Sequence, residues 1–139
     1  MDIQIATLCD FASDYNGKLV ISGTFDTLVA RELPVVHPQC SLALRICMTD
    51  DDNGVHDFSV SIIDQDGHPV DSKMPIKADM PVKVPEDVPF VTRNLVMNLQ
   101  GLRFKSLGLY SIDVTIDGEL VARIPLRILK AKEKSPAKP

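Results

Sequence analysis

The sequence predicts an all-β protein: an antiparallel β-sandwich, immunoglobulin-like, with about seven strands. Apolar residues alternate with polar ones through most segments, as they do in half-buried strands. Glycine, proline, asparagine and aspartate punctuate these segments at short intervals. No segment carries the 3.6-residue apolar stripe of an amphipathic helix. Together these patterns favour two packed antiparallel sheets.

The chain of 139 residues is long enough to bury one core. We expect a single domain over residues 1–130. Residues 131–139 are rich in lysine, proline and alanine and lack the apolar content to fold, so this tail is expected to be disordered.

The first quarter of the chain predicts two strands. Residues 3–9 alternate and form the first, and a polar segment then runs to the turn dipeptide Asn16-Gly17. Residues 18–30 form a long second strand, in which Gly23 indicates a bulge or a close backbone approach.

The middle of the chain predicts a hairpin followed by an irregular crossing. Residues 33–38 form an extended, proline-restricted connection. Residues 41–48 and 56–64 are expected to pair around the acidic turn 50–54. Five prolines punctuate residues 69–89, which predicts an edge strand and a loop that crosses from one sheet to the other. Residues 91–100 restore the strand pattern.

Residues 107–128 predict a second hairpin, turned at Asp117-Gly118. The apolar sets of both its strands are even-numbered, so a two-residue loop would mix the two faces. We therefore expect a three-residue loop with a type I turn and a left-handed Gly118. That register pairs Val114 with Leu120, Ile112 with Ala122, and Tyr110 with Ile124.

Two residues of this hairpin have more specific interpretations. Tyr110 precedes the penultimate strand, as in a tyrosine corner, where its hydroxyl would bond backbone within residues 104–107. A core tyrosine with its hydroxyl in water is an equal alternative. Pro125 lacks an N–H and lies between Arg123 and Arg127, which is typical of an edge protected from pairing.

Charge and composition narrow the classes of partner. The net charge of −4 and pI near 5.2 argue against nucleic acid and anionic membranes, which require a basic footprint. No apolar run approaches a membrane span, and the N-terminus lacks the pattern of a signal peptide. Cys9, Cys40 and Cys47 are an odd count, expected as buried free thiols. These features predict a cytoplasmic protein.

Several motifs together resemble a known family. They include Ile5-Ala6-Thr7-Leu8-Cys9-Asp10, Gly23-Thr24-Phe25-Asp26, His37-Pro38-Gln39-Cys40 and Asn98-Leu99-Gln100-Gly101-Leu102. The chain resembles, over nearly its whole length apart from the tail, a family of short bacterial proteins catalogued as a domain of unknown function. The resemblance implies a single domain with no assigned activity and offers no functional residues to carry over.

The acidic turns are weak candidates for calcium, which takes carboxylate and carbonyl oxygens. The candidates are Asp50 and Asp52 in the first turn, and Asp64 and Asp66 in the second. Neither turn has the full spacing of an EF-hand loop, and solvated turns explain both. We therefore predict no bound metal.

Catalytic and cofactor motifs are weak or absent. His37 and Cys40 lack the two further ligands, at paired spacing, of a zinc site. The sequence holds no nucleophile elbow, phosphate loop or dinucleotide fingerprint. We predict no enzyme, no catalytic residues and no cofactor; a hydrolase built on cysteine and histidine is the minor alternative.

The leading hypothesis is a non-enzymatic binding or assembly module. It would contact a protein partner, or a second copy in a homodimer, through a sheet face, an edge strand or a set of loops. The proline-punctuated segment 69–89 is the favoured interacting region, and Tyr15 is the exposed aromatic to test. The alternative is a domain that binds a small ligand or calcium through the acidic turns.

Overall fold

A computed structural model describes residues 1–132 of the chain. Within them the chain forms nine β-strands and one short 3-10 helix, Asp50–Asp52. The strands are β1 Asp2–Tyr15, β2 Lys18–Thr24, β3 Thr27–Ala30, β4 Val35–Met48, β5 Gly54–Asp64, β6 Ile76–Val82, β7 Val91–Phe104, β8 Gly108–Ile116 and β9 Glu119–Lys130.

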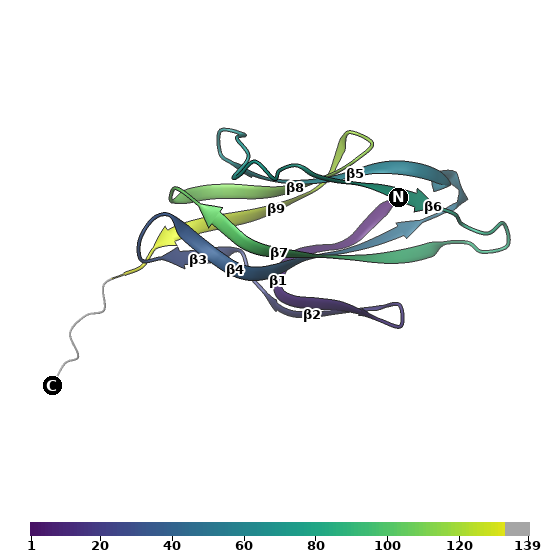
Figure 1. The fold of residues 1–139 in the computed structure, drawn as a ribbon. Helices are drawn as coiled ribbons and strands as arrows, with labels where there is room; N and C mark the ends of the chain where they lie inside the picture. The colour runs from purple at the N-terminus through teal and green to yellow at the C-terminus, as the bar shows by residue number, and fades with distance from the viewer. Residues whose placement is uncertain (133–139) are drawn as a thin grey trace.

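The strands form two sheets stacked face to face (Figure 1). The first has the order β2-β1-β4-β7, and the second has the order β3-β9-β8-β5-β6. All strand pairs are antiparallel except β3 with β9. The predicted all-β antiparallel sandwich is therefore confirmed, with nine strands in place of about seven.

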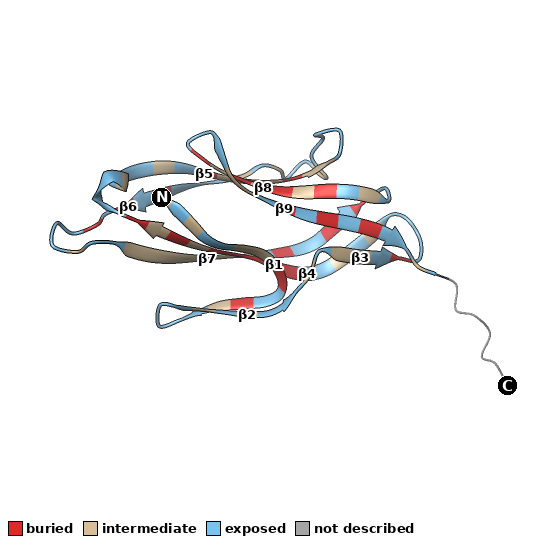
Figure 2. Ribbon diagram, turned by 180° about the vertical axis from the view of Figure 1, so that it is seen from behind, coloured by how far each residue is buried: buried red, intermediate tan, exposed pale blue. Residues whose placement is uncertain are grey.

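The core lies between the sheets, where alternate side chains of each strand meet. Buried residues alternate with half-buried ones along β8 and with exposed ones along the second half of β9, as the colours of Figure 2 show. The central strands β4, β5 and β8 supply most of the fully buried side chains: Leu42, Leu44, Ile46, Met48, Val60, Ile62, Ile112 and Val114. This period-two burial is what the sequence predicts for half-buried strands.

The β1–β2 hairpin adds a partial third layer beneath β4 and β7 (Figure 1). β1 pairs with β4 up to Cys9 and from there with β2. Cys9, Ala12 and Ala43 are buried in a second, smaller cluster, against which Leu19 and Ile21 pack. The expected strand 3–9 thus continues to Tyr15, because small side chains let the hairpin lie close to the outer face of the sheet.

The predicted pairing of residues 41–48 with 56–64 is wrong. β4 and β5 lie in different sheets and face each other across the core. The connection turns sharply, because the backbone N–H of Asp52 donates to the Thr49 carbonyl at 2.9 Å and the Thr49 N–H donates to the Asp52 carboxylate at 2.9 Å. An apolar period of two fits either arrangement, so the pattern alone did not separate a hairpin from a crossing.

The predicted register of the β8–β9 hairpin is also wrong. Asp117 and Gly118 both have positive φ, 52° and 80°, and form a two-residue turn of the primed type. Val114 pairs with Ala122, whereas Thr115 pairs with Leu120, so the extra residue is Val121. This bulge within the strand, rather than an odd loop, restores the even-numbered inward faces. Leu120, expected inside, is exposed.

The segment 69–89 has the predicted character. β6 is the edge strand of the second sheet, and residues 83–90 cross to β7 in the first sheet.

The expected long strand 18–30 is broken into β2 and β3, which belong to different sheets. Among residues 1–132, no helix has the length and apolar character that a membrane crossing requires. Of the expected disordered tail, residues 133–139 lie outside the described residues.

The structural residues singled out in the sequence have specific surroundings. The Tyr110 hydroxyl donates to the Ser106 carbonyl at 2.8 Å, within the predicted backbone stretch. Gly23 has φ +71°, and a Cβ there would lie 2.5 Å from the Asp10 carboxylate, so the backbone and that carboxylate approach closely. Pro125 lies in the part of β9 that β3 does not cover, since β3 pairs only with Arg127 to Lys130.

Candidate functional site: the open side of the sandwich

The four edge strands of the two sheets are β2, β7, β3 and β6, and they differ in how well they are protected. β3 has four residues, and β2 has seven with a lysine at its start. β6 carries Pro81, Lys77 and Asp79, which discourage pairing with another strand. β7 has fourteen residues, no proline and no lysine, and its segment 94–99 holds no charged residue. β7 is therefore the least protected edge.

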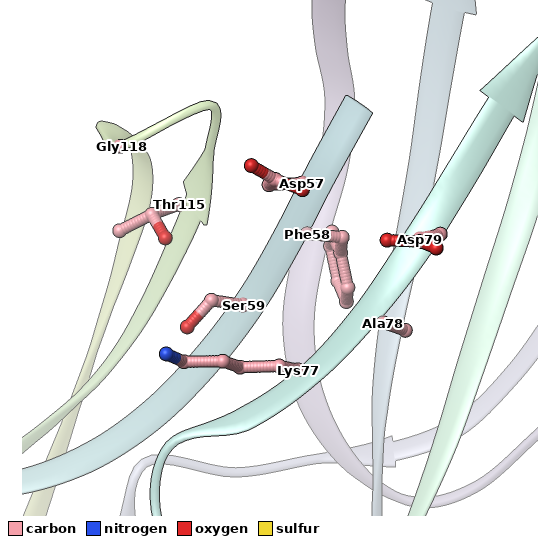
Figure 3. Close-up of a pocket in the computed structure, with 8 residues that line it drawn as sticks. All are labelled: Asp57, Phe58, Ser59, Lys77, Ala78, Asp79, Thr115 and Gly118. Atoms are coloured by element: carbon pink, nitrogen blue, oxygen red, sulfur yellow. The ribbon is translucent and has the colours of Figure 1, made fainter. Parts of the chain in front are cut away.

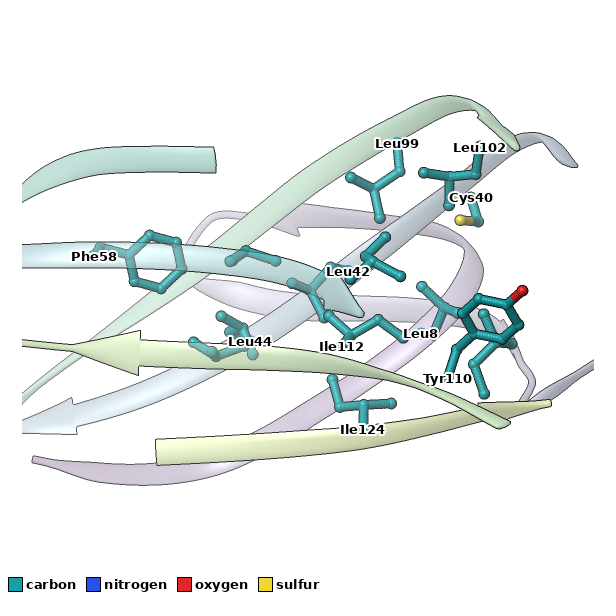
Figure 4. Close-up of a cluster of buried hydrophobic side chains, with 14 of the residues drawn as sticks. Leu8, Cys40, Leu42, Leu44, Phe58, Leu99, Leu102, Tyr110, Ile112 and Ile124 are labelled. Atoms are coloured by element: carbon teal, nitrogen blue, oxygen red, sulfur yellow. The ribbon is translucent and has the colours of Figure 1, made fainter. Parts of the chain in front are cut away.

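An apolar cleft opens between β7 and β6, which we call the β6–β7 cleft. It encloses about 210 Å³. Its apolar lining comes from both sheets and includes Leu42, Leu44, Phe58, Met80, Leu95 and Met97. Figure 4 shows how Leu42, Leu44 and Phe58 point into the core from β4 and β5.

The cleft is open because the two sheets are unequal in length on this side. β6 has only seven residues against the fourteen of β7. Leu95 and Met97 pair with Leu44 and Leu42, and so share their inward face. They nevertheless remain half-buried, whereas Leu42 and Leu44 are fully buried. The inward face of β7 thus presents apolar side chains that lack a covering strand.

Arg93 lies at the rim of the cleft. Strand alternation places it on the same face as Leu95 and Met97. Its Nη2 donates to the Pro81 carbonyl at 2.7 Å, which holds the guanidinium across the gap between the two sheets. A guanidinium has five N–H donors, so this single recorded bond leaves most of its donor capacity available.

The start of β7 is held in place from its other face. Asn94 Nδ2 donates to the Asp14 carboxylate at 2.9 Å and to the Gly17 carbonyl at 3.1 Å, both at the tip of the β1–β2 hairpin. Arg45 Nη1 donates to Asn94 Oδ1 at 2.7 Å. The Gly17 N–H and the Asn94 amide lower the pKa of Asp14. The hairpin therefore braces β7 and leaves its edge uncovered.

A larger hollow of about 640 Å³, bordered by several polar side chains, lies on the outer face of the second sheet. Figure 3 shows Asp57, Ser59, Lys77 and Thr115 around it, with Phe58 pointing to the opposite side of the strand. Asp57 pairs with Asp79 across β5 and β6, which places two like charges side by side. Side chains on an open sheet face stay in contact with water, so a ligand in this hollow would be poorly desolvated. The hollow is therefore a weaker candidate for a binding site than the β6–β7 cleft.

A charged network closes one end of the sandwich. His56 Nδ1 lies 2.6 Å from the Asp117 carboxylate, and Nε2 lies 2.6 Å from the Asp52 carbonyl. Both partners are acceptors, which favours the doubly protonated ring. The Asp117 hydrogen bond and then the Asp52 carbonyl raise the pKa of His56. The N-terminal ammonium of Met1 donates to the Asp52 carboxylate at 3.2 Å.

The same network lowers the pKa of its carboxylates. His56 and then the Asp57 N–H lower the pKa of Asp117. Partial burial raises the pKa of Asp52, but the Thr49 N–H, the N-terminal ammonium and His56 outweigh it and leave that pKa below its ordinary value. These groups are charged partners of one another and hold two turns together.

The four calcium candidates do not form one site. Asp50 and Asp52 precede β5, whereas Asp64 ends this strand and Asp66 follows it, so the two pairs lie at opposite ends of eleven residues of strand. The Asp52 carboxylate is already bonded to Met1 and Thr49. Asp64, Asp66 and His68 place ligand atoms within 4.8 Å of one another in an exposed loop, the one such group among the described residues.

The loop at Asp64 also has an explanation that requires no ion. Asp64 Oδ1 accepts hydrogen bonds from the backbone N–H groups of Asp66 and His68, both at 2.9 Å. This is ordinary turn chemistry for aspartate. The sequence suggested the two aspartates but missed His68 as their neighbour.

Two of the three cysteines lack the lowered thiol pKa of a catalytic nucleophile. Cys9, Cys40 and Cys47 are free. Burial raises the pKa of Cys40 to about 11, and burial likewise raises that of Cys9, so both thiols are protonated at neutral pH. His37 lies in β4 rather than in the expected loop, and its ring packs 5.5 Å from that of Phe25.

Sequence reasoning missed the open edge and Arg93. The signal was present, because residues 94–99 are free of charge and proline while β6 is not. Tyr15, the aromatic singled out in the sequence, is 66% exposed on the outer face of the hairpin, beside exposed Phe11 and Val20. The hairpin thus carries an exposed apolar group of its own, apart from the open edge.

Comparison with known proteins identifies a family and little else. The profile of a family described as "Family of unknown function (DUF6941)" matches residues 4–129. No curated protein matches the chain. Among solved structures, an alkylpurine DNA glycosylase from Pseudomonas fluorescens, bound to DNA containing an abasic site analog, is similar over 92% of this chain and 30% of its own length. The identity is 11% and the TM-score 0.48.

The exclusion of nucleic acid as a partner is therefore wrong, because the matched glycosylase is bound to DNA. The exclusion rested on a net charge of −4, and a net charge is a sum that does not describe local patches. A TM-score of 0.48 at 11% identity in turn supports no proposal of DNA binding. This chain spans 30% of the glycosylase, so the activity of that whole protein is not transferred.

Proposed function

The chain belongs to a family of unknown function, DUF6941, and we propose that it is a non-enzymatic binding module that accepts an extended segment of a partner protein along β7. Addition of a strand to an exposed sheet edge is a common mode of peptide recognition. Main-chain hydrogen bonds supply affinity, and pockets for alternate side chains supply specificity.

One observation carries this proposal: the least protected edge strand borders the apolar cleft. Long uncharged edges template unwanted pairing, so proteins normally blunt them. Here β6 is blunted and β7 is not, and the uncovered Leu95 and Met97 line a cleft beside that edge. An added strand would pair the free edge and cover the apolar side chains at once.

A partner segment fits this edge better than a second copy. The charges on β7 are Arg93 and Arg103, so two copies that pair through β7 would bring arginines together. A homodimer through β7 is the competing outcome, which the test below separates.

The test is to select extended peptides from a displayed random library on the immobilised full chain and to locate their binding by amide hydrogen exchange. We expect enriched peptides to protect residues 94–99 of β7. Leu95→Lys places a charge on the inward face and should abolish their binding, because inward charges are a natural protection of edges.

Val29→Lys is the matched control, since Val29 is an exposed apolar residue of the edge strand β3. It should leave the binding of the same peptides unchanged. Protection at β3 or β2, or equal binding to Leu95→Lys, would contradict the proposal. A dimer in light scattering that Leu95→Lys converts to a monomer would assign the edge to a second copy.

A second candidate function, cation binding, is favoured by the group of Asp64, Asp66 and His68. If this loop binds calcium, millimolar calcium raises the melting temperature of the chain and Asp66→Asn removes the rise. Asp51→Asn, in the other acidic turn, is the control. An unchanged melting temperature for the unaltered chain would eliminate this candidate.

The same proposal includes an immunoglobulin-like fold relationship, a reducing compartment and a bacterial source. The Tyr110–Ser106 bond supports an immunoglobulin-like relationship, since it has the geometry of a tyrosine corner. The three free cysteines support a reducing compartment, such as the cytoplasm. A bacterial source rests on the sequence resemblance alone.

A further inference from the structure

The first sheet fixes the direction in which a segment would add to β7. Its strand pairs β1–β2, β1–β4 and β4–β7 are all antiparallel. An added strand that continues this pattern runs antiparallel to β7. In an antiparallel pair, residues directly opposite each other point to the same face of the sheet.

The register then fixes which side chains of the segment face the cleft. Met97, Leu95 and Arg93 follow one another at spacings of two along the inward face of β7. The residues opposite them occur in the partner in the reverse direction. Read from its N-terminus, the partner presents one side chain to Met97, then one to Leu95, and then one to Arg93.

The cleft sets the chemistry of the first two positions. An apolar cavity of about 150 Å³ is large enough for a benzene ring. The β6–β7 cleft, at about 210 Å³, accommodates one large aliphatic or aromatic side chain, with the neighbouring apolar position lying over its rim. Polar side chains there would lose their water without a partner.

Arg93 sets the chemistry of the third position. Arg93 is half-buried as a whole residue, its guanidinium bond to Pro81 is exposed, and the Pro81 carbonyl is the one acceptor it has among the described residues. A guanidinium pairs best with a carboxylate, often through two hydrogen bonds. Asp79 also borders the cleft, but alternation places it on the outer face with Asp57, away from the inward face of Arg93.

We infer that β7 recognises an extended segment in which two apolar residues and an acidic residue occupy alternate positions, in the order apolar-x-apolar-x-acidic. This inference rests on the proposed function and specifies the partner that the same edge accepts. The carboxylate offsets Arg93, and the apolar pair fills and covers the cleft.

The probe is a fluorescent synthetic peptide with blocked ends, Ser-Thr-Ile-Thr-Leu-Thr-Asp-Thr-Ser, measured by fluorescence anisotropy on the full chain. Replacing the peptide's aspartate by lysine should weaken binding about tenfold or more, because it exchanges a charged hydrogen bond for repulsion. In Arg93→Glu this preference should reverse, so that the lysine peptide binds more tightly.

Arg103→Glu is the matched control, because Arg103 lies on the same strand but is exposed and opposite Val36. It should leave the order of the two peptides unchanged. Arg93→Gln, which removes the charge without reversing it, should bind both peptides about equally. Circular dichroism verifies that each variant is folded.

The outcomes separate this inference from the proposed function. If Leu95→Lys abolishes binding of both peptides but their order does not respond to Arg93→Glu, strand addition stands and the acidic position is overturned. If neither peptide binds and library selection also yields no peptide that protects β7, the proposed function fails with it.

Discussion

The two lateral sides of the sandwich are closed in different ways. On one side the chain crosses from β2 to β3 within two residues, and backbone hydrogen bonds tie this crossing to both sheets. The Phe25 N–H donates to the Leu8 carbonyl of β1 at 3.0 Å, and the Arg127 N–H of β9 donates to the Asp26 carbonyl at 2.9 Å. On the other side residues 83–90 cross from β6 to β7 in a longer connection, and beyond it the Arg93 side chain donates to the Pro81 carbonyl.

This difference indicates which side of the sandwich supports stability and which side can bind a partner. The side at β2 and β3 offers a partner little to pair with, because these edge strands have only seven and four residues. The side at β6 and β7 offers more, because the fourteen-residue edge and the inward face of β7 remain accessible. If this contrast holds, substitutions on the closed side lower the stability of the chain more than substitutions on the open side.

The largest expected effect compares two Leu→Ala substitutions. Leu126 lies in β9 with 1% of its surface exposed, whereas Leu95 lies half-buried in β7. Leu126→Ala removes packing and leaves a cavity, so we expect a loss of about 2–5 kcal/mol in the free energy of unfolding. Leu95→Ala should cost about 1 kcal/mol, because its side chain is already partly in water.

Urea denaturation of both variants measures the comparison. Equal losses would mean that the cleft is packed as tightly as the core, and would argue against an open binding side. A larger loss for Leu95→Ala would reverse the comparison altogether.

The next effect concerns the start of the closed side, where β2 ends. Gly23→Ala adds a Cβ 2.5 Å from the Asp10 carboxylate oxygen at φ +71°, and should cost about 2–3 kcal/mol. Gly17→Ala has a similar φ of +82° with no atom within 4 Å, so it should cost only about 1–2 kcal/mol. Thermal denaturation checks the order.

Asp10→Ala combined with Gly23→Ala isolates the contact. Shortening the Asp10 side chain removes the nearest atoms, so the further cost of Gly23→Ala should fall toward that of Gly17→Ala. A cost that persists in full would show that backbone conformation, rather than the close approach, requires this glycine.

A smaller effect is expected at Tyr110, which follows the connection from β7 to β8. Tyr110→Phe removes the hydroxyl that donates to the Ser106 carbonyl at 2.8 Å, and should cost about 0.5–1.5 kcal/mol. The ring still packs edge-on against Phe104 at 5.0 Å, so the fold should persist. An unchanged urea midpoint would mean that water replaces the bond without loss.

The sequence predicted what depends on local alternation. The inward faces of β5 and β8, the strand at residues 91–100 and the crossing character of residues 69–89 followed from period two and from proline chemistry. These features are decided within a few residues, because a strand's two faces are fixed by its own backbone.

The sequence did not predict what depends on pairing. Nothing local distinguishes β4 and β5 in one sheet from β4 and β5 in opposite sheets, and the Val121 bulge depends on which residues Val114 and Thr115 face. The candidate site was missed for the same reason. An uncharged strand becomes an exposed edge only when its neighbours are known.

The smallest expected effect is a pH dependence at the end of the sandwich. His56 joins the turn before β5 to the turn between β8 and β9, through the Asp52 carbonyl and the Asp117 carboxylate. Its pKa is raised in the folded chain, chiefly by Asp117. The stabilisation is therefore fully present below the unfolded pKa of about 6.5 and is lost as pH rises through the higher folded value.

We expect the melting temperature to fall modestly as the pH rises from about 6 to 8, because solvent screens this partly exposed pair. His56→Gln should flatten that fall, whereas His68→Gln, in the exposed loop near Asp64, should not. Asp52 and Asp117 behave in the opposite way. Their pKa values are lowered, so their contributions to stability are lost as the pH falls. A fall that persists in His56→Gln would place the titrating group elsewhere, and the network would then be a passive contact between two turns.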